Sequence, residues 1–392
     1  MDTIRLGIVG IGNMGSAHSK SVSSGAVPGI MLTAVADRRT ARRKWAEESL
    51  PPGTAVFEEG DALIESGLCD AALIATPHYQ HPGLAEKAFA NGLHVMCEKP
   101  AGVYAKQVRL MNEAAERSGL AFGMMFNQRT NCLYRKMHEL VADGELGAIM
   151  RVSWIITDWF RTQFYYDSGD WRGTWAGEGG GVLLNQCPHQ LDLLQWICGM
   201  PSSVTAFCHE GKWHDIEVED DVTAYLEYGG GATGVFVTST GDAPGSNRFE
   251  VSMEKGKLVC ENGKLALYRL EESARDFCKT ADKGFATPKG EWEAVETDGE
   301  NPQHAGVLRA FADHILRGGD MVAGGAEGIN GLMLSNAMHL SSWLKRPVSL
   351  PVDEDLFLAE LDKRRAAPAR KGSRKSERID GKDITLDTAG SY

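Results

Sequence analysis

The sequence predicts an α/β protein with two domains, in which a doubly wound parallel sheet is followed by an α/β domain with a large open, mainly antiparallel sheet. Strand and helix patterns alternate over the first 126 residues, which is typical of a parallel sheet covered by helices on both faces. From about residue 148, alternating β-branched and aromatic segments are separated by Gly-Gly and Asn-Gly turns, which indicates hairpins. A length of 392 residues leaves room for two or three domains.

The chain divides into three regions, namely 1–127, 128–362 and 363–392. Apolar runs in the first region predict buried parallel strands at 4–10, 31–37, 71–76, 94–98 and 121–127, with helices at 82–90 and 105–118 between them. In the second region one helix, beginning near 182–185, separates the first strand from the others, and two more are expected near 303–317 and 325–343. The third region is basic and poor in apolar residues, so we expect a solvated extension or an arm lying on a neighbouring subunit.

Composition excludes several classes of function. A formal net charge of -12 and a pI near 5.5 argue against nucleic acid or an anionic membrane as the main partner. No apolar run is long enough to cross a bilayer, and the N-terminus enters a strand pattern without a signal core. The eight cysteines are dispersed, which favours reduced, buried thiols over disulfides or a metal site. We therefore expect a cytoplasmic protein without a bound metal.

A glycine-rich turn follows the first predicted strand. In "RLGIVGIGNMGSAHSKSV", Gly10, Gly12 and Gly15 form a G-x-G-x-x-G pattern that also opens a helix, which is the context of the dinucleotide-binding (Rossmann) fingerprint. The first glycine permits a sharp turn, the second lets the backbone approach a pyrophosphate, and the third lets the helix pack close to the sheet. Asn13 and Met14 complete this expected anion-binding turn at the helix N-terminus.

An acidic residue ends the second predicted strand, 22 residues beyond Gly15. Asp37 is expected to accept hydrogen bonds from the adenosine ribose and to repel a 2′-phosphate, which favours NAD over NADP. Arg38 and Arg39 follow directly and weaken this preference, because a guanidinium can pair with a phosphate. NAD is the expected cofactor, with NADP as the less favoured one.

Two further segments follow strand ends, where ligands bind in open α/β sheets. They read "ALIATPHYQHP" (73–82) and "HVMCEKPAG" (94–102). Together with the glycine turn and the later sheet, they closely resemble the Gfo/Idh/MocA oxidoreductase family, which includes glucose–fructose oxidoreductase and inositol dehydrogenases. The resemblance covers roughly residues 3–350, and the triplet Glu98-Lys99-Pro100 is its most specific short signature.

The resemblance implies a Rossmann domain, a second domain whose open sheet often forms subunit contacts, and hydride transfer between NAD(P) and a hydroxyl carbon of a sugar or cyclitol. It also implies that Lys99 contacts the substrate hydroxyl and the cofactor. A partly desolvated lysine has a lowered pKa and can stabilise a developing alkoxide. Other positions that border the cofactor in the family correspond to Thr76, Pro77, His81, Glu98 and Asn127.

The mid-chain segment "GGGVLLNQCPHQLDLLQW" carries the expected proton acceptor. Family members commonly have an aspartate four residues before a catalytic histidine, which maps to Asn185 and His189 here. We expect Asn185, His189 and Asp192 to share one helix face, with Asp192 contacting the substrate or a neighbouring group. Two consequences are open. Asn185 binds a substrate hydroxyl while His189 takes the proton, or, because Asn185 lacks the negative charge of the usual aspartate, Lys99 carries the proton chemistry.

Aromatic residues precede this helix in "FRTQFYYDSGDWRGTWAGEGGG". Aromatic faces with hydrogen-bonding groups between them suit a sugar ring, so Tyr165, Trp171 and Trp175 are expected to wall the substrate pocket, with Arg172 near the cofactor or substrate. Farther on, "KWHDIEVEDD" (212–221) matches no strong metal motif and is expected to be a solvated loop followed by a strand.

The sequence therefore predicts an NAD-dependent dehydrogenase that oxidises a secondary hydroxyl of a sugar, glycoside or cyclitol. Lys99 polarises the oxygen and His189 takes the proton. An alternative is a redox-neutral enzyme that recycles tightly bound NAD while it cleaves or epimerises a glycoside. A third reading is a non-catalytic sensor of sugars or dinucleotides. A homo-oligomer, either a dimer or a tetramer, is the expected assembly.

Overall fold

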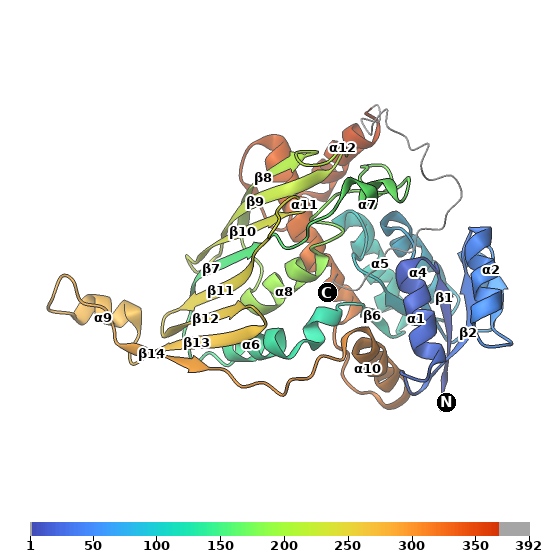
Figure 1. Ribbon diagram of the computed structural model, residues 1–392, viewed down its shortest axis with the longest axis horizontal. Coiled ribbons are helices and arrows are strands. Elements are labelled where there is room, and N and C mark those ends of the chain that lie inside the picture. Colours follow the sequence, from blue (N-terminus) through green and yellow to red (C-terminus); the bar gives the residue numbers. More distant parts are fainter. Residues whose placement is uncertain (1, 368–392) are drawn as a thin grey trace.

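The computed structural model describes residues 2–367, which form two sheets joined by helices (Figure 1). The first sheet has six strands in the order β3-β2-β1-β4-β5-β6, and the second has nine in the order β14-β13-β12-β11-β7-β10-β9-β8-β15. This is the α/β class expected from the sequence. The part of the third predicted region from 368 to 392 lies outside the described residues.

All strands of the first sheet are parallel. They are β1 (Ile4–Val9), β2 (Ile30–Ala36), β3 (Ala55–Phe57), β4 (Ala71–Ile74), β5 (His94–Cys97) and β6 (Phe122–Met124). The helices between them are α1 (Asn13–Ser23), α2 (Thr40–Ser49), α3 (Gly60–Ile64), α4 (His81–Ala90) and α5 (Ala105–Ser118). Because the strand order reverses between β1 and β4, the crevice above these two strands is the natural ligand site of the sheet.

The second sheet is mixed, although most of its pairs are antiparallel. Its strands are β7 (Ile149–Ile156), β8 (Ser203–Glu210), β9 (Glu219–Glu227), β10 (Thr233–Ser239), β11 (Asn247–Met253), β12 (Gly256–Glu261), β13 (Lys264–Leu270), β14 (Gly290–Ala294) and β15 (Val348–Ser349). Strand β7 lies between β11, to which it is antiparallel, and β10, to which it is parallel. The long excursion after β7 carries α7 (Gln163–Asp167) and α8 (Pro188–Cys198) before β8 returns to the sheet.

Helices cover one face of the second sheet and connect it to the first domain (Figure 1). They include α6 (Cys132–Ala142), α8 and α11 (Gly328–Leu344), and their apolar residues share one buried core with both sheets. Helix α10 (Gln303–Arg317) instead packs on the first sheet, where Phe311 joins the core that also holds Val22 of α1. The remaining helices are α9 (Ala274–Thr280) and α12 (Glu354–Arg365).

The start of α8 differs from the sequence prediction. The helix begins at Pro188 rather than near 182–185, and Asn185 lies in the turn before it. Proline has no N–H to donate within a helix, so it occupies the first turn. The prediction that Asn185 shares a helix face with His189 and Asp192 is therefore wrong.

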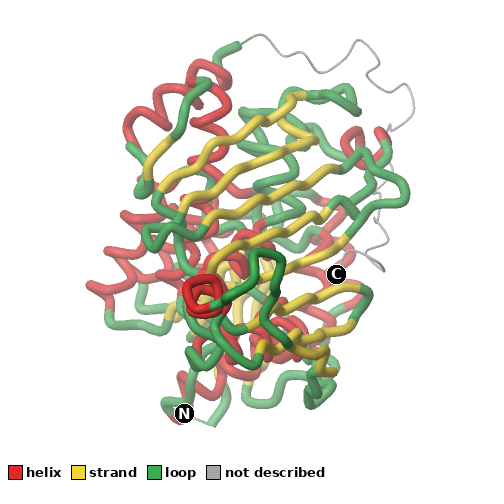
Figure 2. The backbone as a smooth tube through the Cα atoms, turned by 90° about the vertical axis from the view of Figure 1, so that its left-hand side faces the viewer, coloured by secondary structure: helices red, strands yellow, loops and turns green. Residues whose placement is uncertain are grey.

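The other face of the second sheet is largely uncovered by helices, as Figure 2 shows. Several large apolar side chains are exposed on its strands, among them Ile155, Phe207 and Tyr225. Among the described residues, no helix is both long enough and apolar enough to cross a membrane.

Candidate active site

A cleft of about 470 Å³ lies where the strands β1, β2, β4 and β5 of the first sheet end. It brings together most of the residues that the sequence predicts for cofactor and substrate. From the first domain these are Gly10, Gly12, Asn13, Met14, Asp37, Arg38, Thr76, Pro77, His81, Glu98 and Lys99. From the second domain they are Trp171, Arg172 and Asn185. The cleft therefore has one wall from each domain.

The glycine turn has the shape that a dinucleotide requires. Gly10 has a φ of 89°, and a Cβ there would lie 2.8 Å from the carbonyl oxygen of Ala75. Gly15 lies behind the turn rather than in the cleft lining, and a Cβ on it would clash with the carbonyl oxygen of Gly10. Because both positions are glycine, α1 packs close to β1 and its N-terminus stays open to an anion.

Asp37 lines the cleft, with its carboxylate held by several hydrogen bonds. It accepts hydrogen bonds from the backbone N–H groups of Ile11 (3.1 Å) and Arg39 (2.9 Å), and from the Arg39 guanidinium (3.1 Å). Arg38 turns to Glu59 at 2.8 Å instead. The glycine turn and this carboxylate together fit the pyrophosphate and ribose of NAD.

Lys99 reaches from the first domain to the second. Its Nζ donates a hydrogen bond to the backbone carbonyl of Asn185 at 3.0 Å. Burial lowers the pKa of Lys99, Glu98 opposes that effect, and Arg172 and Arg161 lower the pKa further. An ammonium group with a lowered pKa, held at the junction of both walls, can polarise a substrate oxygen and exchange its proton.

Glu98, the residue before Lys99, is anchored by a histidine from α1. His18 Nε2 lies 2.6 Å from Glu98 Oε1, and the two side chains are almost fully buried. Burial alone would raise the pKa of Glu98, but the hydrogen bond and charge of His18 hold it at about 2. His18 was not among the predicted site residues, although it lies one helical turn beyond the glycine pattern.

His189 is 4% exposed in the first turn of α8, with the ring of Phe126 edge-on at 6.2 Å between centroids. Burial lowers its pKa well below the ordinary value, and the charge of Lys99 lowers it further. The imidazole is therefore neutral near pH 7, the form that accepts a proton. His189 is not part of the cleft lining, so its role as proton acceptor stays a prediction.

An aromatic and cationic cluster borders the cleft from the segment before α8. The Arg172 guanidinium lies 4.5 Å from the ring centroids of both Tyr165 and Trp171. Its Nη1 also donates to the Tyr165 hydroxyl at 2.7 Å. Trp171 lines the cleft, where its ring also meets His78 edge-on at 5.6 Å, whereas Tyr165 supports Arg172 from behind.

Three predicted site residues are held elsewhere by other partners. Asp192 accepts two hydrogen bonds from Arg129, at 2.7 and 2.8 Å, in a buried ion pair. Trp175 packs against His339 in the core of the second domain, and Asn127 is fully buried and donates to Gln303. None of these three lines the cleft, so the structure does not bring them together with Lys99.

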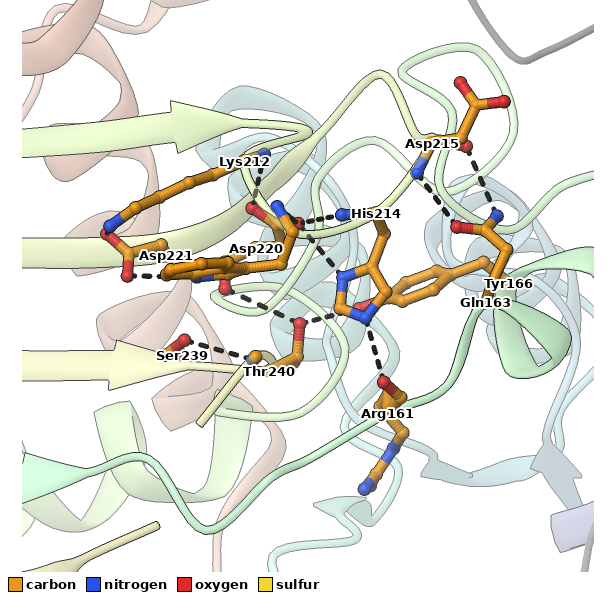
Figure 3. Close-up of polar contacts among 12 residues, drawn as sticks. Arg161, Gln163, Tyr166, Lys212, His214, Asp215, Asp220, Asp221, Ser239 and Thr240 are labelled. Atoms are coloured by element: carbon orange, nitrogen blue, oxygen red, sulfur yellow. Dashed lines mark hydrogen bonds and ion pairs between the residues drawn. The ribbon is translucent and has the colours of Figure 1, made fainter. Parts of the chain in front are cut away.

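The segment 212–221 is the loop followed by a strand that the sequence predicts: Lys212, Trp213 and Asp215 are exposed, and β9 begins at Glu219. Asp220 is fully buried and accepts hydrogen bonds from the backbone N–H groups of Lys212, Trp213 and His214. Figure 3 shows His214 between Asp220 and the Arg161 carbonyl, at 3.0 and 2.8 Å. This imidazole ties the 212–221 segment to the chain that leads into the aromatic cluster.

Glu219, the neighbour of Asp220, has a second structural role. Its buried carboxylate accepts hydrogen bonds from the backbone N–H groups of Gly181 (2.9 Å) and Leu183 (3.0 Å), and His339 Nε2 lies 2.9 Å away. It therefore fixes the turn that carries Asn185. Among residues 2–367, no group of three or more His, Cys, Asp or Glu side chains is arranged to hold a metal ion.

Comparison with known proteins agrees with this two-domain geometry. Residues 4–126 match the model of an oxidoreductase family with an NAD-binding Rossmann fold, and residues 134–259 match the GFO/IDH/MocA C-terminal domain. The chain belongs to the GFO/IDH/MocA oxidoreductase family. It is accordingly an NAD(P)-dependent oxidoreductase that acts on CH–OH groups, and NAD is its cofactor.

Among the relatives, the rhizopine catabolism protein MocA of Rhizobium meliloti is 29% identical over 51% of this chain, and the match spans 58% of MocA. Inositol 2-dehydrogenase of the same species is 24% identical over 89% of this chain and 99% of its own length. Among solved structures, the WlbA dehydrogenase of Bordetella pertussis in complex with NADH and UDP-GlcNAcA is 25% identical, with a TM-score of 0.75. That match covers 90% of this chain and all of the WlbA chain.

Proposed function

We propose that the protein is an NAD-dependent dehydrogenase that oxidises a secondary hydroxyl of a sugar, glycoside or cyclitol. The observation that carries the proposal is the contact between Lys99 and Asn185, one from each domain, in the cleft that the glycine turn and Trp171 also line. The ammonium, the amide and the aromatic face are the groups that a hydroxylated ring needs. Inositol dehydrogenases among the relatives, and the WlbA dehydrogenase solved with NADH and UDP-GlcNAcA, support the same substrate class.

In the proposed mechanism Lys99 binds the hydroxyl oxygen of the substrate and stabilises negative charge as it develops there. His189, neutral because burial and Lys99 lower its pKa, receives the hydroxyl proton at a ring nitrogen. Arg172 and Trp171 orient the ring. The glycine turn would hold the pyrophosphate of NAD and Asp37 its ribose, and the bound nicotinamide would accept the hydride.

The test is turnover by the purified protein with NAD and three polyols, namely myo-inositol, D-glucose and methyl α-D-glucopyranoside. NADH should accumulate with at least one of them, and its rate of formation should fall by about 10²–10³-fold in a Lys99→Ala variant. Cofactor that copurifies with the protein, together with substrate conversion and no net NADH, would favour the redox-neutral alternative. Absence of any conversion with a broad panel of sugars and cyclitols would contradict the proposal.

We also propose that the open face of the second sheet forms the contacts of a homo-oligomer, a dimer or a tetramer. The exposed side chains of Phe207 (63%) and Tyr225 (41%) support this assignment, because large apolar groups gathered on one face mark interaction surfaces. Light scattering should give a multiple of the chain mass, and a Phe207→Asp, Tyr225→Asp double variant should shift it toward the monomer.

A further inference from the structure

The carboxyl group of Glu178 is buried directly behind the second-domain wall of the cleft. Glu178 is 1% exposed, and its Oε2 accepts a hydrogen bond from the backbone N–H of Gly173 at 2.6 Å. Its Oε1 accepts from the Asn185 side-chain Nδ2 and lies 4.0 Å from Arg172 Nη1. Glu178 does not line the cleft, but both Asn185 and Arg172 do. The carboxylate therefore acts on the cleft through its neighbours.

The chemistry of this contact decides which end of the Asn185 amide faces the substrate. An ionised carboxylate only accepts hydrogen bonds, so it selects the NH₂ end of the amide. The Asn185 Oδ1 is then left as an acceptor for the cleft. The backbone carbonyl of the same residue holds Lys99 Nζ at 3.0 Å, so a fixed acceptor stands next to the cationic donor.

We propose that Glu178 is a positioning residue that fixes Asn185 as a hydrogen-bond acceptor for a substrate hydroxyl adjacent to the one bound by Lys99. The inference rests on the proposed function, because it assigns a partner to a second hydroxyl of the same substrate. Because Lys99 Nζ is hydrogen-bonded to the backbone of Asn185, the Lys99 donor and the Asn185 acceptor belong to adjoining groups, which matches two hydroxyls on neighbouring carbons of a polyol. The selected substrate class is thus one with vicinal hydroxyl groups, of which the neighbour of the reacting one donates to Asn185.

Substitution of Glu178 by glutamine should reverse the amide. The Gly173 N–H still requires an acceptor, so the glutamine Oε1 turns toward it and its Nε2 turns toward Asn185. Asn185 must then present Oδ1 to the glutamine and its NH₂ group to the cleft. Substitution of Asn185 by aspartate has a different effect, because it places a second carboxylate against Glu178 in a buried site. The double variant E178Q/N185D restores one amide and one carboxylate.

The contact itself is tested without substrate, by the thermal unfolding of the wild type, E178Q, N185D and E178Q/N185D at pH 8 and pH 5.5. We expect N185D to lower Tm by about 4 °C or more at pH 8 and by less at pH 5.5, where one of the two carboxyl groups takes a proton. E178Q/N185D should recover most of the loss at pH 8. Single-variant effects that simply add in the double variant would overturn the proposed contact.

The positioning role is tested by steady-state kinetics with NAD and the same three polyols. E178Q should raise KM about tenfold, the effect of one lost hydrogen bond, while kcat changes less than KM does. E178Q/N185D should return KM toward the wild-type value. The control is E293Q, since Glu293 pairs with Arg269 at the far edge of the second sheet and should leave both constants unchanged.

An unchanged KM in E178Q would overturn the positioning role. Failure of the proposed function has a different signature, because the wild type itself would then turn over none of the polyols. In that case, thermal unfolding of the wild type, the two single variants and the double variant would still decide whether Glu178 fixes Asn185.

Discussion

The two walls of the cleft are held by different kinds of interaction. In the first domain, strand ends and a glycine turn bring the lining residues together, as where Asp37 at the end of β2 accepts a hydrogen bond from the N–H of Ile11 after β1. In the second domain, buried side chains hold segments that are distant in sequence, such as Glu219 with the N–H of Gly181. The residues that line the first wall are therefore marked by local sequence patterns, although His18 and Glu98 behind it pair across 80 residues. The second wall has few such patterns and depends mainly on pairs that form when the chain folds.

The largest expected effect comes from the point where the walls meet. Lys99→Ala removes the ammonium group that contacts the second domain through Asn185. We expect kcat to fall by about 10²–10³-fold, as for the loss of one preorganised donor to a developing oxyanion. NADH accumulation with the best polyol gives kcat, and the Tm serves as the control for folding. A variant that retains wild-type kcat would remove Lys99 from the chemistry.

The first wall was largely predictable from the sequence because its signals are local. Gly10, Asp37 and Lys99 each follow a strand, and all three line the same cleft. The short strand β3 (Ala55–Phe57) was missed, since three residues carry no measurable alternation.

The second wall was predicted only in part. His189 and Trp171 were named from a resemblance and from composition, but the partners that place this wall were not. Glu219 meets Gly181 across 38 residues, and Asp192 meets Arg129 across 63. No periodicity in the chain encodes such pairs. Proline chemistry did provide a usable signal for the start of α8 at Pro188, and the prediction placed that start too early.

Two matched glycine substitutions, one in each wall, test the two walls independently. A Cβ on Gly15 would clash with the Gly10 carbonyl, and one on Gly181 would clash with the Glu219 carbonyl. Each alanine variant should lose about 1–3 kcal/mol of stability through overpacking. Gly15→Ala should also weaken NADH binding, measured by fluorescence titration, whereas Gly181→Ala should leave it intact.

The control for this pair is Gly83→Ala, because no atom lies within 4 Å of a Cβ at that position. Because Gly83 lies in α4, where alanine forms a helix more readily than glycine, this variant should not lower Tm and should leave NADH affinity unchanged. Equal losses of NADH affinity in Gly15→Ala and Gly181→Ala would contradict the proposed division between the walls.

The buried Glu98–His18 pair predicts an acid-sensitive first wall. The pKa of Glu98 is lowered from 4.5 to about 2, so its stabilising effect is complete above the unfolded value and is lost as pH falls toward 2. Between pH 5 and pH 3 the wild type should lose about 2 kcal/mol more unfolding free energy than Glu98→Gln, which cannot titrate. Denaturant unfolding at both pH values measures the difference, and parallel pH profiles would refute it.

The smallest expected effect concerns the support behind the second wall. His214→Ala removes the bridge between Asp220 and the Arg161 carbonyl, while the backbone N–H groups of the 212–221 segment still satisfy Asp220. The loss of these bonds should lower Tm by about 2–4 °C. It should also raise KM for the polyol, because the chain from Arg161 leads into the aromatic cluster.

Kinetics and thermal unfolding of His214→Ala should be compared with His209→Ala, the matched control. His209 also pairs with an aspartate, Asp221 at 2.9 Å, but its side chain is 53% exposed, and exposed pairs contribute little. If both variants behave like the wild type, the second wall does not depend on the 212–221 segment. If only His214→Ala raises KM, long-range side-chain pairs control the substrate side of the cleft even though none of them touches the substrate.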